Sequence, residues 1–511
     1  MHLNYTNGRL IIMNSDPIIL VIDQGTTSTR AVLMDCSANI IALSSAPIQQ
    51  IYPKTGWVEH NAEQIWDSVK STILTLKKDH PNHYSRIASI GITNQRETTV
   101  VWDKSNGKPL HNAIVWQDTR TSDFCKENMH LDDKIRKKTG LLLNPYFSAT
   151  KIRWILETYD PQRSLCNNNK IIAGTIDTYL IWKLSGTKSF YTDHTNGSRT
   201  LLMNIHIGDW DNELLSDFNI PKNILPEIKP SVFNFGSTSG IDFLPEGIPI
   251  MGVAGDQQAS LVGHRCHSPG QAKCTFGTGA FLLSHTGDSP ISSDTGLLTT
   301  LAATTGHKLQ YCLEGSVFIA GAAVQWLRDG LGIFKTASES ETFSLESDQS
   351  SDIVFIPALS GLGCPYWNSD FQGSILGLTR KTTKKEITRA SLEGVTHQVA
   401  DLLEAIAVNF SNPIKILAID GGMTENKFFN QLLANTTGVY IQTSANAEMT
   451  SIGAGILAGI GSGLMKLDDF NTPNDPKGRM YKPDVKSEIM LKKRNRWKKA
   501  IKSLEEFYKL T

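Results

Sequence analysis

The hydrophobic pattern near the start of the chain predicts three short strands joined by tight turns. An apolar, β-branched run occupies residues 18–22 and ends at Asp23. Polar residues at 25–29 separate it from a second strand at 30–34, and a third strand is expected at 40–44. Runs of this length, bounded by Gly, Ser and Asn, are typical of strands rather than helices.

A similar pattern returns far downstream in the second half of the chain. Strands are predicted at 271–275 and 280–284, and the glycine-rich turn at 276–279 connects them. The two hairpins share little sequence beyond Gly-Thr in the turn. Their common shape therefore indicates two copies of one architecture rather than a short solenoid repeat.

Each half also contains a strand that leads through a short polar turn into a helix. The alternation of strands and helices predicts an α/β fold built from two related halves. In the first half the strand is expected at 248–254 and the helix at 258–263, and in the second half they are expected at 414–419 and 426–437. The other elements we expect are a helix at 63–77 that starts at Asn61, a strand at 87–92, and an amphipathic closing helix at 487–510.

The length of the chain predicts more than one domain. A chain of 511 residues exceeds what one ordinary hydrophobic core holds. The helical pattern breaks after residue 264, where His, Pro and Gly follow one another. We therefore expect an N-terminal extension at 1–15, a first domain at 16–264 and a second domain at 265–511.

Charge and cysteine content limit the classes of partner. The chain has 50 basic and 50 acidic residues, so it has no overall field to attract nucleic acid or anionic lipid, and we expect no nucleic-acid partner. It contains no apolar run of membrane length, so we expect no membrane insertion. The seven scattered cysteines form no C-x-x-C pair, which argues against a disulfide framework and favours a reducing, cytoplasmic location.

The first hairpin turn, within DQGTTSTR at 23–30, carries residue types that hold a phosphate. A glycine at 25 lets an anion approach the backbone, and hydroxyl and N–H groups can surround its oxygens. An arginine adds a charge-assisted donor, and an aspartate can associate with hydrated Mg²⁺. A polar turn without a ligand is the alternative. The residues concerned are Asp23, Thr26, Thr27, Ser28 and Arg30.

Two glycine-rich turns in the second half suit a nucleotide. Thr278, between two glycines, can face the first turn and grip a triphosphate from the other side, although such a turn alone is more often only a turn. The paired glycines before Met423 can lie against adenine, with Asn426 at its edge, or can simply begin a helix. The chain has neither a Walker A loop nor a dinucleotide-binding glycine fingerprint.

Two further positions carry the chemistry of a hydroxyl substrate. Asp256 follows a strand and precedes a helix, where a carboxylate can act as a general base, although capping the helix is the commoner role of such a residue. Adjacent Arg96 and Glu97 offer donors beside acceptors, which is the combination that chelates a vicinal diol. The alternative is an exposed ion pair that contributes little.

Together, these segments resemble the FGGY carbohydrate kinases over nearly the whole chain. The resemblance implies two duplicated α/β domains of the actin–hexokinase, ribonuclease H-like type, with an active-site cleft between them that binds ATP and Mg²⁺. The matching segments include DQGTTSTR at 23–30, GITNQRETTVVW at 91–102, NPYFSATKIRWIL at 144–156, AGDQQASLVG at 254–263, FGTGAF at 276–281 and DGG at 420–422.

The resemblance also implies a function, which is transfer of the γ-phosphate of ATP to glycerol, giving sn-glycerol 3-phosphate, in glycerol catabolism. Asp256 is implied as the base and Asp23 as the carboxylate associated with the metal. The implied phosphate contacts are Thr26, Thr27, Ser28, Arg30 and Thr278, and the implied nucleotide contacts are Gly321, Gln325, Gly422 and Asn426. The implied glycerol contacts are Arg96, Glu97, Tyr146, Asp256 and Gln257, with Trp116 and Phe281 as an apolar wall.

Three other functions stay open at this stage. The first is a related kinase of a ketose, an alditol or a sugar acid, and the second is an interaction protein of the actin or chaperone type. The third is an inactive descendant, which the intact motifs disfavour. We also expect a homo-oligomer, a dimer or a tetramer. Some members of the family that the chain resembles carry, in the segment that corresponds to 237–248, an arginine that binds an inhibitory sugar bisphosphate or a histidine that is phosphorylated. This chain has no Arg, Lys or His there, so we expect neither form of control.

Overall fold

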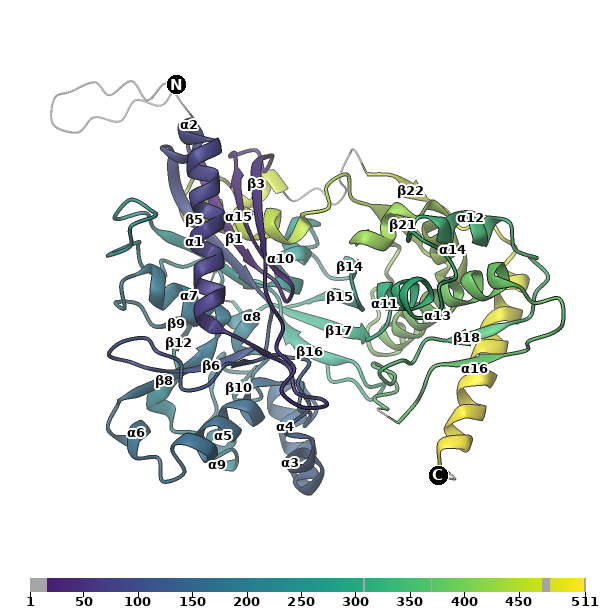
Figure 1. The fold of residues 1–511 in the computed structure, drawn as a ribbon, viewed down its shortest axis with the longest axis horizontal. Coiled ribbons are helices and arrows are strands. Elements are labelled where there is room, and N and C mark those ends of the chain that lie inside the picture. The colour runs from purple at the N-terminus through teal and green to yellow at the C-terminus, as the bar shows by residue number, and fades with distance from the viewer. Residues whose placement is uncertain (1–15, 307, 369, 471–477, 510–511) are drawn as a thin grey trace.

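The computed structural model describes residues 16–306, 308–368, 370–470 and 478–509, which form two lobes lying side by side (Figure 1). The predicted N-terminal extension at 1–15 lies outside the described residues. Each lobe is built on its own central sheet, and strands from the two halves of the chain supply the two sheets. The two-domain α/β fold that the sequence predicts is therefore confirmed.

The sheet of the first lobe has the strand order β13-β5-β1-β2-β3. Strands β1, β2 and β3 form an antiparallel meander, and β5 and β13 run parallel to β1. The predicted strands are confirmed, with ends that differ by a few residues. The bounds are β1 Ile18–Gln24, β2 Ser28–Met34, β3 Ile40–Pro47, β5 Ile87–Asn94 and β13 Ile250–Gly255.

The sheet of the second lobe repeats this arrangement. Strands β14, β15 and β17 are antiparallel neighbours, and β20 and β21 continue the sheet in parallel from β14. The duplication inferred from the two hairpins is thus present in the strand order. The bounds are β14 Ala272–Phe276, β15 Ala280–Gly287, β16 Leu298–Leu301, β17 Tyr311–Val317, β20 Ile416–Asp420, β21 Tyr440–Thr443 and β22 Met480–Tyr481.

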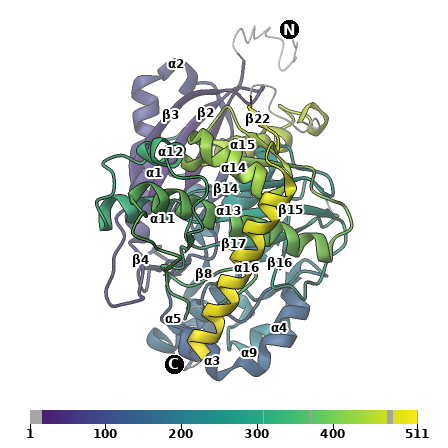
Figure 2. The same cartoon turned by 90° about the vertical axis from the view of Figure 1, so that its right-hand side faces the viewer.

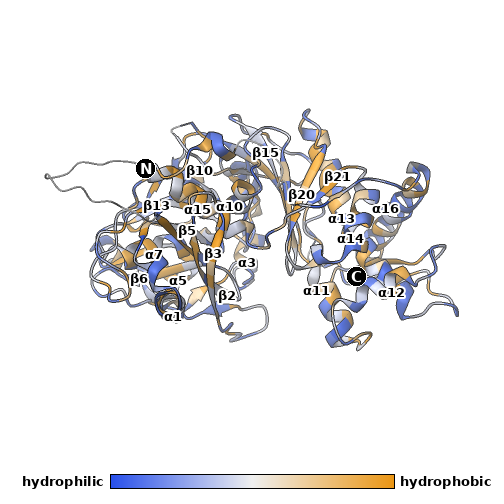
Figure 3. Ribbon diagram, turned by 90° about the horizontal axis from the view of Figure 1, so that it is seen from above, coloured by the Kyte–Doolittle hydropathy of each residue, from blue (hydrophilic) through white to orange (hydrophobic). Residues whose placement is uncertain are grey.

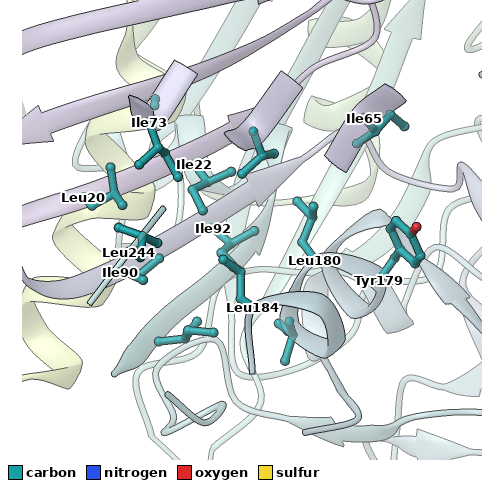
Figure 4. Close-up of a cluster of buried hydrophobic side chains, with 14 of the residues drawn as sticks. Leu20, Ile22, Ile65, Ile73, Ile90, Ile92, Tyr179, Leu180, Leu184 and Leu244 are labelled. Atoms are coloured by element: carbon teal, nitrogen blue, oxygen red, sulfur yellow. The ribbon is translucent and has the colours of Figure 1, made fainter. Parts of the chain in front are cut away.

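Helices cover the sheets, and both the strands and parts of the covering helices are hydrophobic (Figure 3). Helix α1 begins after Asn61, whose side chain accepts hydrogen bonds from the backbone N–H groups of Glu63 and Gln64, as expected of a cap. Leu20, Ile22 and Ile92 of the sheet point toward buried side chains of the covering helices, including Ile73 and Leu180 (Figure 4). The principal helices are α1 Ala62–Asp79, α7 Ile176–Leu184, α10 Asp256–Gly263, α13 Lys384–Asn409, α14 Lys427–Thr437, α15 Met449–Gly461 and α16 Ser487–Lys509.

The closing helix α16 runs along the outside of the second lobe (Figure 2). Its amphipathic character is confirmed, because Trp497, Ile501 and Leu504 are buried. The fourth residue of the predicted apolar face, Phe507, is 58% exposed. In the same turn, Tyr508 packs against the cluster, with its ring centroid 5.5 Å from that of Phe371. No helix within the described residues is long and apolar enough to cross a membrane.

Helix α15 comes late in the sequence but packs on the sheet of the first lobe. Ile452 and Leu457 belong to one buried cluster with Ile19 and Val21 of β1. The helix also crosses α10 closely, since a Cβ added to Gly453 would lie 1.8 Å from the carbonyl oxygen of Ala259. The first lobe therefore contains chain from both halves, and the domain boundary predicted after residue 264 stays a prediction.

Smaller elements complete the two lobes. A four-stranded sheet, β4-β7-β6-β8, and short helices extend the first lobe beside the cleft. In the first lobe they are α2 Pro81–Tyr84, β4 Glu59–His60, β6 Thr99–Asp103, β7 Ala113–Ile114, α3 Ser122–Glu127, α4 Asp132–Thr139, α5 Ser148–Tyr159, α6 Ser164–Asn167, β8 Ile171–Thr175, β9 Tyr191–Asp193, α8 His194–Gly197, β10 Met203–Asn204, β11 Asp209–Trp210, α9 Asn212–Asp217 and β12 Glu227–Lys229; in the second they are α11 Gly321–Gln325, α12 Glu339–Leu345, β18 Val354–Ile356 and β19 Ser374–Leu376.

Candidate active site

A cavity of about 620 Å³ lies between the two hairpin turns, and both lobes contribute to its walls. It brings together most of the residues that the sequence singled out for phosphate and polyol contact. Its lining includes Thr26, Thr27, Ser28 and Arg30 from the first hairpin, Arg96, Glu97, Trp116, Tyr146, Asp256 and Gln257 from the rest of the first lobe, and Thr278, Gly279 and Phe281 from the second.

The first hairpin turn is joined to the aromatic wall of the cavity. The backbone N–H of Gly25 donates to the carbonyl of Ser28 at 2.9 Å, which closes the turn. The indole Nε1–H of Trp116 donates to Thr26 Oγ1 at 2.9 Å. One hydroxyl of the predicted phosphate turn therefore also orients the wall that the polyol carbon chain is predicted to touch.

Asp23 lies behind this turn rather than in the lining of the cavity. Its carboxylate is buried and accepts a hydrogen bond from Ser451 Oγ of α15 at 2.7 Å. Arg30 Nη1 is 4.0 Å away. Burial raises the pKa of Asp23 to about 6, although Arg30 and Ser451 oppose the rise. Among the described residues, no group of three or more His, Cys, Asp and Glu side chains is arranged to hold a metal ion by itself.

The second hairpin turn is packed against backbone on its far side. A Cβ added to Gly279 would lie 2.5 Å from the carbonyl oxygen of Val317, and one added to Gly321 would lie 2.5 Å from that of Gly277. Gly421 has a φ of +93° and approaches Phe276 in the same way. Glycine at these positions is therefore required by close approach of the backbone.

The four predicted nucleotide contacts lie outside the lining of the cavity, and Gly321 approaches the second hairpin at Gly277. Gly321 and Gln325 are the first and last residues of α11, and the N–H of Gly321 donates to the carbonyl of Gly277 at 3.0 Å. Gly422 follows β20. Asn426 caps α14, because its side-chain oxygen accepts from the N–H of Phe429 at 2.8 Å. The turn that contains the paired glycines therefore does lead into a helix, as the alternative interpretation of this segment expected.

Asp256 is the first residue of α10, and Gly255 occupies the capping position before it. The alternative role of Asp256 as a helix cap is therefore wrong. Its side chain is 31% exposed, accepts from the N–H of Gln257 at 2.8 Å, and lies 3.4 Å from Arg96 Nε. Partial burial raises the pKa of Asp256, and the positive charges of Arg96 and Lys273 oppose this rise.

Arg96 and Glu97 are almost fully buried, so the alternative of an exposed ion pair is wrong. Burial raises the pKa of Glu97, and Arg199 and Arg96 oppose the rise. Arg199 Nε donates to Glu97 Oε1 at 2.5 Å. Glu314 accepts from both terminal nitrogens of Arg96, at 2.7 Å each.

Three buried charged residues behind the cavity did not emerge from the sequence. They are Arg199, Glu314 and Lys273, and the ammonium of Lys273 donates to Gln257 Oε1 at 2.5 Å and to Thr275 Oγ1 at 2.9 Å. For Glu314 and Lys273, the sequence did contain an indication of a buried functional role, which is a charged residue within an otherwise apolar strand. Glu314 stands within YCLEGSV and Lys273 within AKCTF, both of which are otherwise suited to burial.

Three aromatic rings from both lobes form one side of the cavity. Trp116 meets Tyr146 edge to face at 5.5 Å between ring centroids, and Phe281 of β15 at 6.1 Å. Aromatic pairs favour this edge-to-face geometry. A small molecule bound here would meet these rings as well as the charged hydrogen-bonding groups of Arg96 and Asp256, which line the same cavity.

Models of known families match both halves of the chain. The N-terminal domain of the FGGY family of carbohydrate kinases matches residues 18–263, and its C-terminal domain matches residues 272–462. Among curated proteins, the glycerol kinases of Geobacillus sp. (strain WCH70) and Listeria monocytogenes serovar 1/2a are each 44% identical to this chain, over 491 and 497 residues. In both cases the match covers 96% of this chain and 99% of the relative.

Solved structures agree with these matches. The crystal structure of Plasmodium falciparum glycerol kinase with ADP has a TM-score of 0.88 and 36% identity, and covers 96% of this chain and 98% of that one. Gluconate kinase from Lactobacillus acidophilus, at 24% identity with a TM-score of 0.86, shares the fold, covering 97% of this chain and all of that one. By its duplicated fold, its interlobe cavity and these matches, the chain belongs to the FGGY family of carbohydrate kinases.

Proposed function

We propose that this protein is an ATP-dependent glycerol kinase, which transfers the γ-phosphate of ATP to glycerol and yields sn-glycerol 3-phosphate and ADP in glycerol catabolism. The observation that carries the proposal is the 44% identity to glycerol kinases over nearly the whole chain. The small polar pocket beside an aromatic wall supports it. A three-carbon triol suits such a pocket because it offers hydroxyls on one side and carbon on the other.

Asp256 is the residue we propose as the general base. A terminal hydroxyl of glycerol gives its proton to Asp256 as its oxygen forms a bond to the γ-phosphorus, and the bond from that phosphorus to the bridging oxygen of ADP breaks. The raised pKa of Asp256 brings it nearer the range in which a carboxylate accepts a proton efficiently. Arg96 and Glu97 hold the other two hydroxyls, with Tyr146 and Gln257 beside them.

The two hairpins are proposed to hold the phosphates from opposite sides. Thr26, Thr27, Ser28 and Arg30 of the first hairpin line the same cavity as Thr278 of the second, which supports this proposal. Catalysis would then rest mainly on positioning and on stabilisation of developing charge. Gly321, Gln325, Gly422 and Asn426 are proposed to contact the rest of the nucleotide, around the second hairpin.

Mg²⁺ is the metal we propose, and the residues near the first hairpin fit it. Asp23 provides a buried carboxylate whose raised pKa reflects poor compensation of its charge, and a cation nearby would supply that compensation. Oxygen donors are the ligands that Mg²⁺ prefers, with waters filling most positions. When bound, the ion would neutralise phosphate charge.

The substrate proposal is tested by ADP release from purified protein with Mg²⁺, ATP and single acceptors. The panel contains glycerol, dihydroxyacetone, xylulose, ribulose and gluconate. Glycerol is expected to give the highest kcat/KM. Turnover of a sugar or sugar acid in place of glycerol would assign the protein to another activity within the family, and ATP turnover indifferent to all acceptors would favour the interaction-protein alternative.

The base is tested with Asp256→Asn. We expect kcat with glycerol to fall by about a thousandfold, because general-base catalysis contributes factors of that order. ADP affinity, measured by calorimetry, is expected to stay unchanged and so reports an intact fold. Near-normal turnover by this variant would show that another group accepts the proton.

Two further proposals concern the protein as a whole. We propose that it acts in the cytoplasm, where ATP and reduced thiols are available; seven free cysteines support this. We also propose that it forms a dimer or tetramer. Light scattering coupled to size exclusion measures this directly, and a monomer mass at micromolar concentration would contradict it.

A further inference from the structure

Glu314 is a carboxylate of the second lobe that reaches the polar pocket of the first. It lies in the middle of β17, is 1% exposed, and accepts hydrogen bonds from both terminal nitrogens of Arg96. Arg199 Nη1 lies 3.4 Å from Glu314 Oε2, the oxygen that also accepts from Arg96 Nη1. Burial alone would raise the pKa of Glu314, but Arg199 and Arg96 outweigh burial and lower it to about 2, so Glu314 is ionised at neutral pH.

This contact determines which edge of Arg96 faces the cavity. A guanidinium group is planar, so a carboxylate that holds both terminal nitrogens also sets the direction of the Nε–H edge. On that edge, Arg96 Nε lies 3.4 Å from Asp256 Oδ1 and 3.9 Å from Glu97 Oε1. Arg96 Nη1 also donates to Gln258 Oε1 at 3.3 Å. Glu314 therefore determines which N–H groups of Arg96 remain free to bind a substrate beside Asp256, the proposed base.

The same strand leads directly to the second phosphate turn. Val317, at the end of β17, pairs with Ala280 at the start of β15. Just beyond the strand, the N–H of Ala320 donates to the carbonyl of Thr278 at 2.9 Å. One rigid strand pair thus carries both the carboxylate that orients Arg96 and the turn that faces the phosphates.

We infer that Glu314 is a positioning residue for glycerol: from the opposite lobe, it holds Arg96 so that the Nε–H edge binds a substrate hydroxyl beside Asp256. This role rests on the proposed function, because it assigns a part in glycerol binding to a group that would not touch glycerol itself. It also makes the glycerol pocket complete only when the two lobes are in contact.

The test is Glu314→Gln, which keeps the shape of the side chain and removes its charge. The amide can accept from one nitrogen of Arg96 but sets its own NH₂ against the other. We expect the KM for glycerol to rise by at least about tenfold, since hydrogen bonds between buried charged groups are strong. The KM for ATP is expected to stay within about twofold, because a loss confined to glycerol binding appears in one constant only.

A double-mutant comparison tests whether Glu314 acts through Arg96. In Arg96→Lys, the planar fork is already lost, so adding Glu314→Gln is expected to change the KM for glycerol by less than about twofold. Glu314→Asp retains the charge and is expected to give a smaller rise than Glu314→Gln in the native background. If the Gln variant fails to fold, judged by melting and ADP binding, the Asp variant with and without Arg96→Lys provides the same comparison.

The matched control is Asp401→Asn. Asp401 is also a buried carboxylate of the second lobe, and it pairs with Arg494 at 2.5 Å, away from the cavity. Its loss is expected to lower the melting temperature and leave the KM for glycerol unchanged. An unchanged glycerol KM in Glu314→Gln, or the full rise persisting with Arg96→Lys, would overturn the inference. Absence of glycerol turnover in the wild type would instead overturn the proposed function.

Discussion

Burial determines what each charged residue around the cavity can contribute. In water, neighbouring Arg and Glu side chains attract each other weakly, but Arg96 and Glu97 are nearly removed from solvent, where each charge must be matched. Glu314 matches Arg96 and Arg199 matches Glu97. The pair is thereby held in one geometry, as precise recognition of a small diol requires.

Lys273 makes a residue-scale prediction about pH. Its positive charge lowers the pKa of Asp256 against the rise caused by burial. Lys273→Met is therefore expected to raise that pKa further. Because the proposed base must be ionised to accept a proton, the acid limb of the kcat/KM profile for glycerol should move to higher pH, by about one unit.

The measurement is kcat/KM for glycerol between about pH 5 and about pH 9, because this range includes the raised pKa values that buried carboxylates reach. Lys183→Met serves as the control, since Lys183 is a half-buried lysine of the first lobe that lies over Trp66, away from the cavity. An acid limb that stays in place in Lys273→Met, or moves to lower pH, would contradict the proposed electrostatic role.

At the scale of elements, glycine decides how closely helices and strands can approach. Helices α10 and α15 cross with almost no side chain between them: Gly263 faces the carbonyl of Met449, and Gly453 faces that of Ala259. Strand β13 also approaches α15 closely, since a Cβ added to Gly252 would lie 2.3 Å from the backbone nitrogen of Ala458. These contacts set the position of α10, whose first residue is Asp256.

Gly453→Ala is expected to destabilise this crossing. The added methyl group would sit 1.8 Å from backbone, where no side-chain rotation can relieve the contact. We expect the free energy of unfolding to fall by about 2 kcal/mol or more, as overpacking of a buried site does. Denaturant unfolding measures it. Gly306→Ala, which meets nothing within 4 Å, is the control, and equal stability of the two variants would refute the crossing.

At the scale of the whole molecule, the first lobe is completed by the far end of the chain. Ala254 and Val262 share a buried cluster with Ile456 and Leu457 of α15, so the first 264 residues alone would expose that surface to water. Connectivity along the chain and packing in space therefore divide the protein differently. The candidate active site lies where the two divisions meet, beside α10.

This packing predicts the behaviour of fragments. Residues 16–264 expressed alone are expected to lack a cooperative thermal transition, because an apolar face of the sheet stays uncovered. Fusing 445–465 to them through a flexible linker should restore the transition, measured by near-ultraviolet circular dichroism. Fusing residues 487–509, which pack on the second lobe, is not expected to restore the transition. A cooperative transition of 16–264 by itself would confirm the boundary predicted after residue 264.

The sequence alone predicted the five strands of the first central sheet, strands β14, β15 and β20 of the second, and helices α1, α10, α14 and α16, because these depend on local order. Alternating or continuous apolar runs identify strands, and glycine-rich polar segments between them identify turns. Local position also singled out Asp256 and Arg96, because each stands just after a strand, whereas Trp116 was implied only by the family resemblance. Nothing local distinguished a cap from a base at Asp256, however.

The tertiary structure alone decided which charges face one another and which glycines are indispensable. Glu314 and Lys273 lie in strands of the second lobe, and their partners Arg96 and Gln257 belong to the first, so no spacing along the chain links them. The burial of Arg96 and the crossing of α10 with α15 likewise result from contacts between segments that are far apart in the chain. The sequence thus determined the elements and the candidate chemistry, because periodicity and turn residues act over a few positions. The pairing of buried charges depends on contacts between residues far apart in the chain, and only the packed lobes specify those.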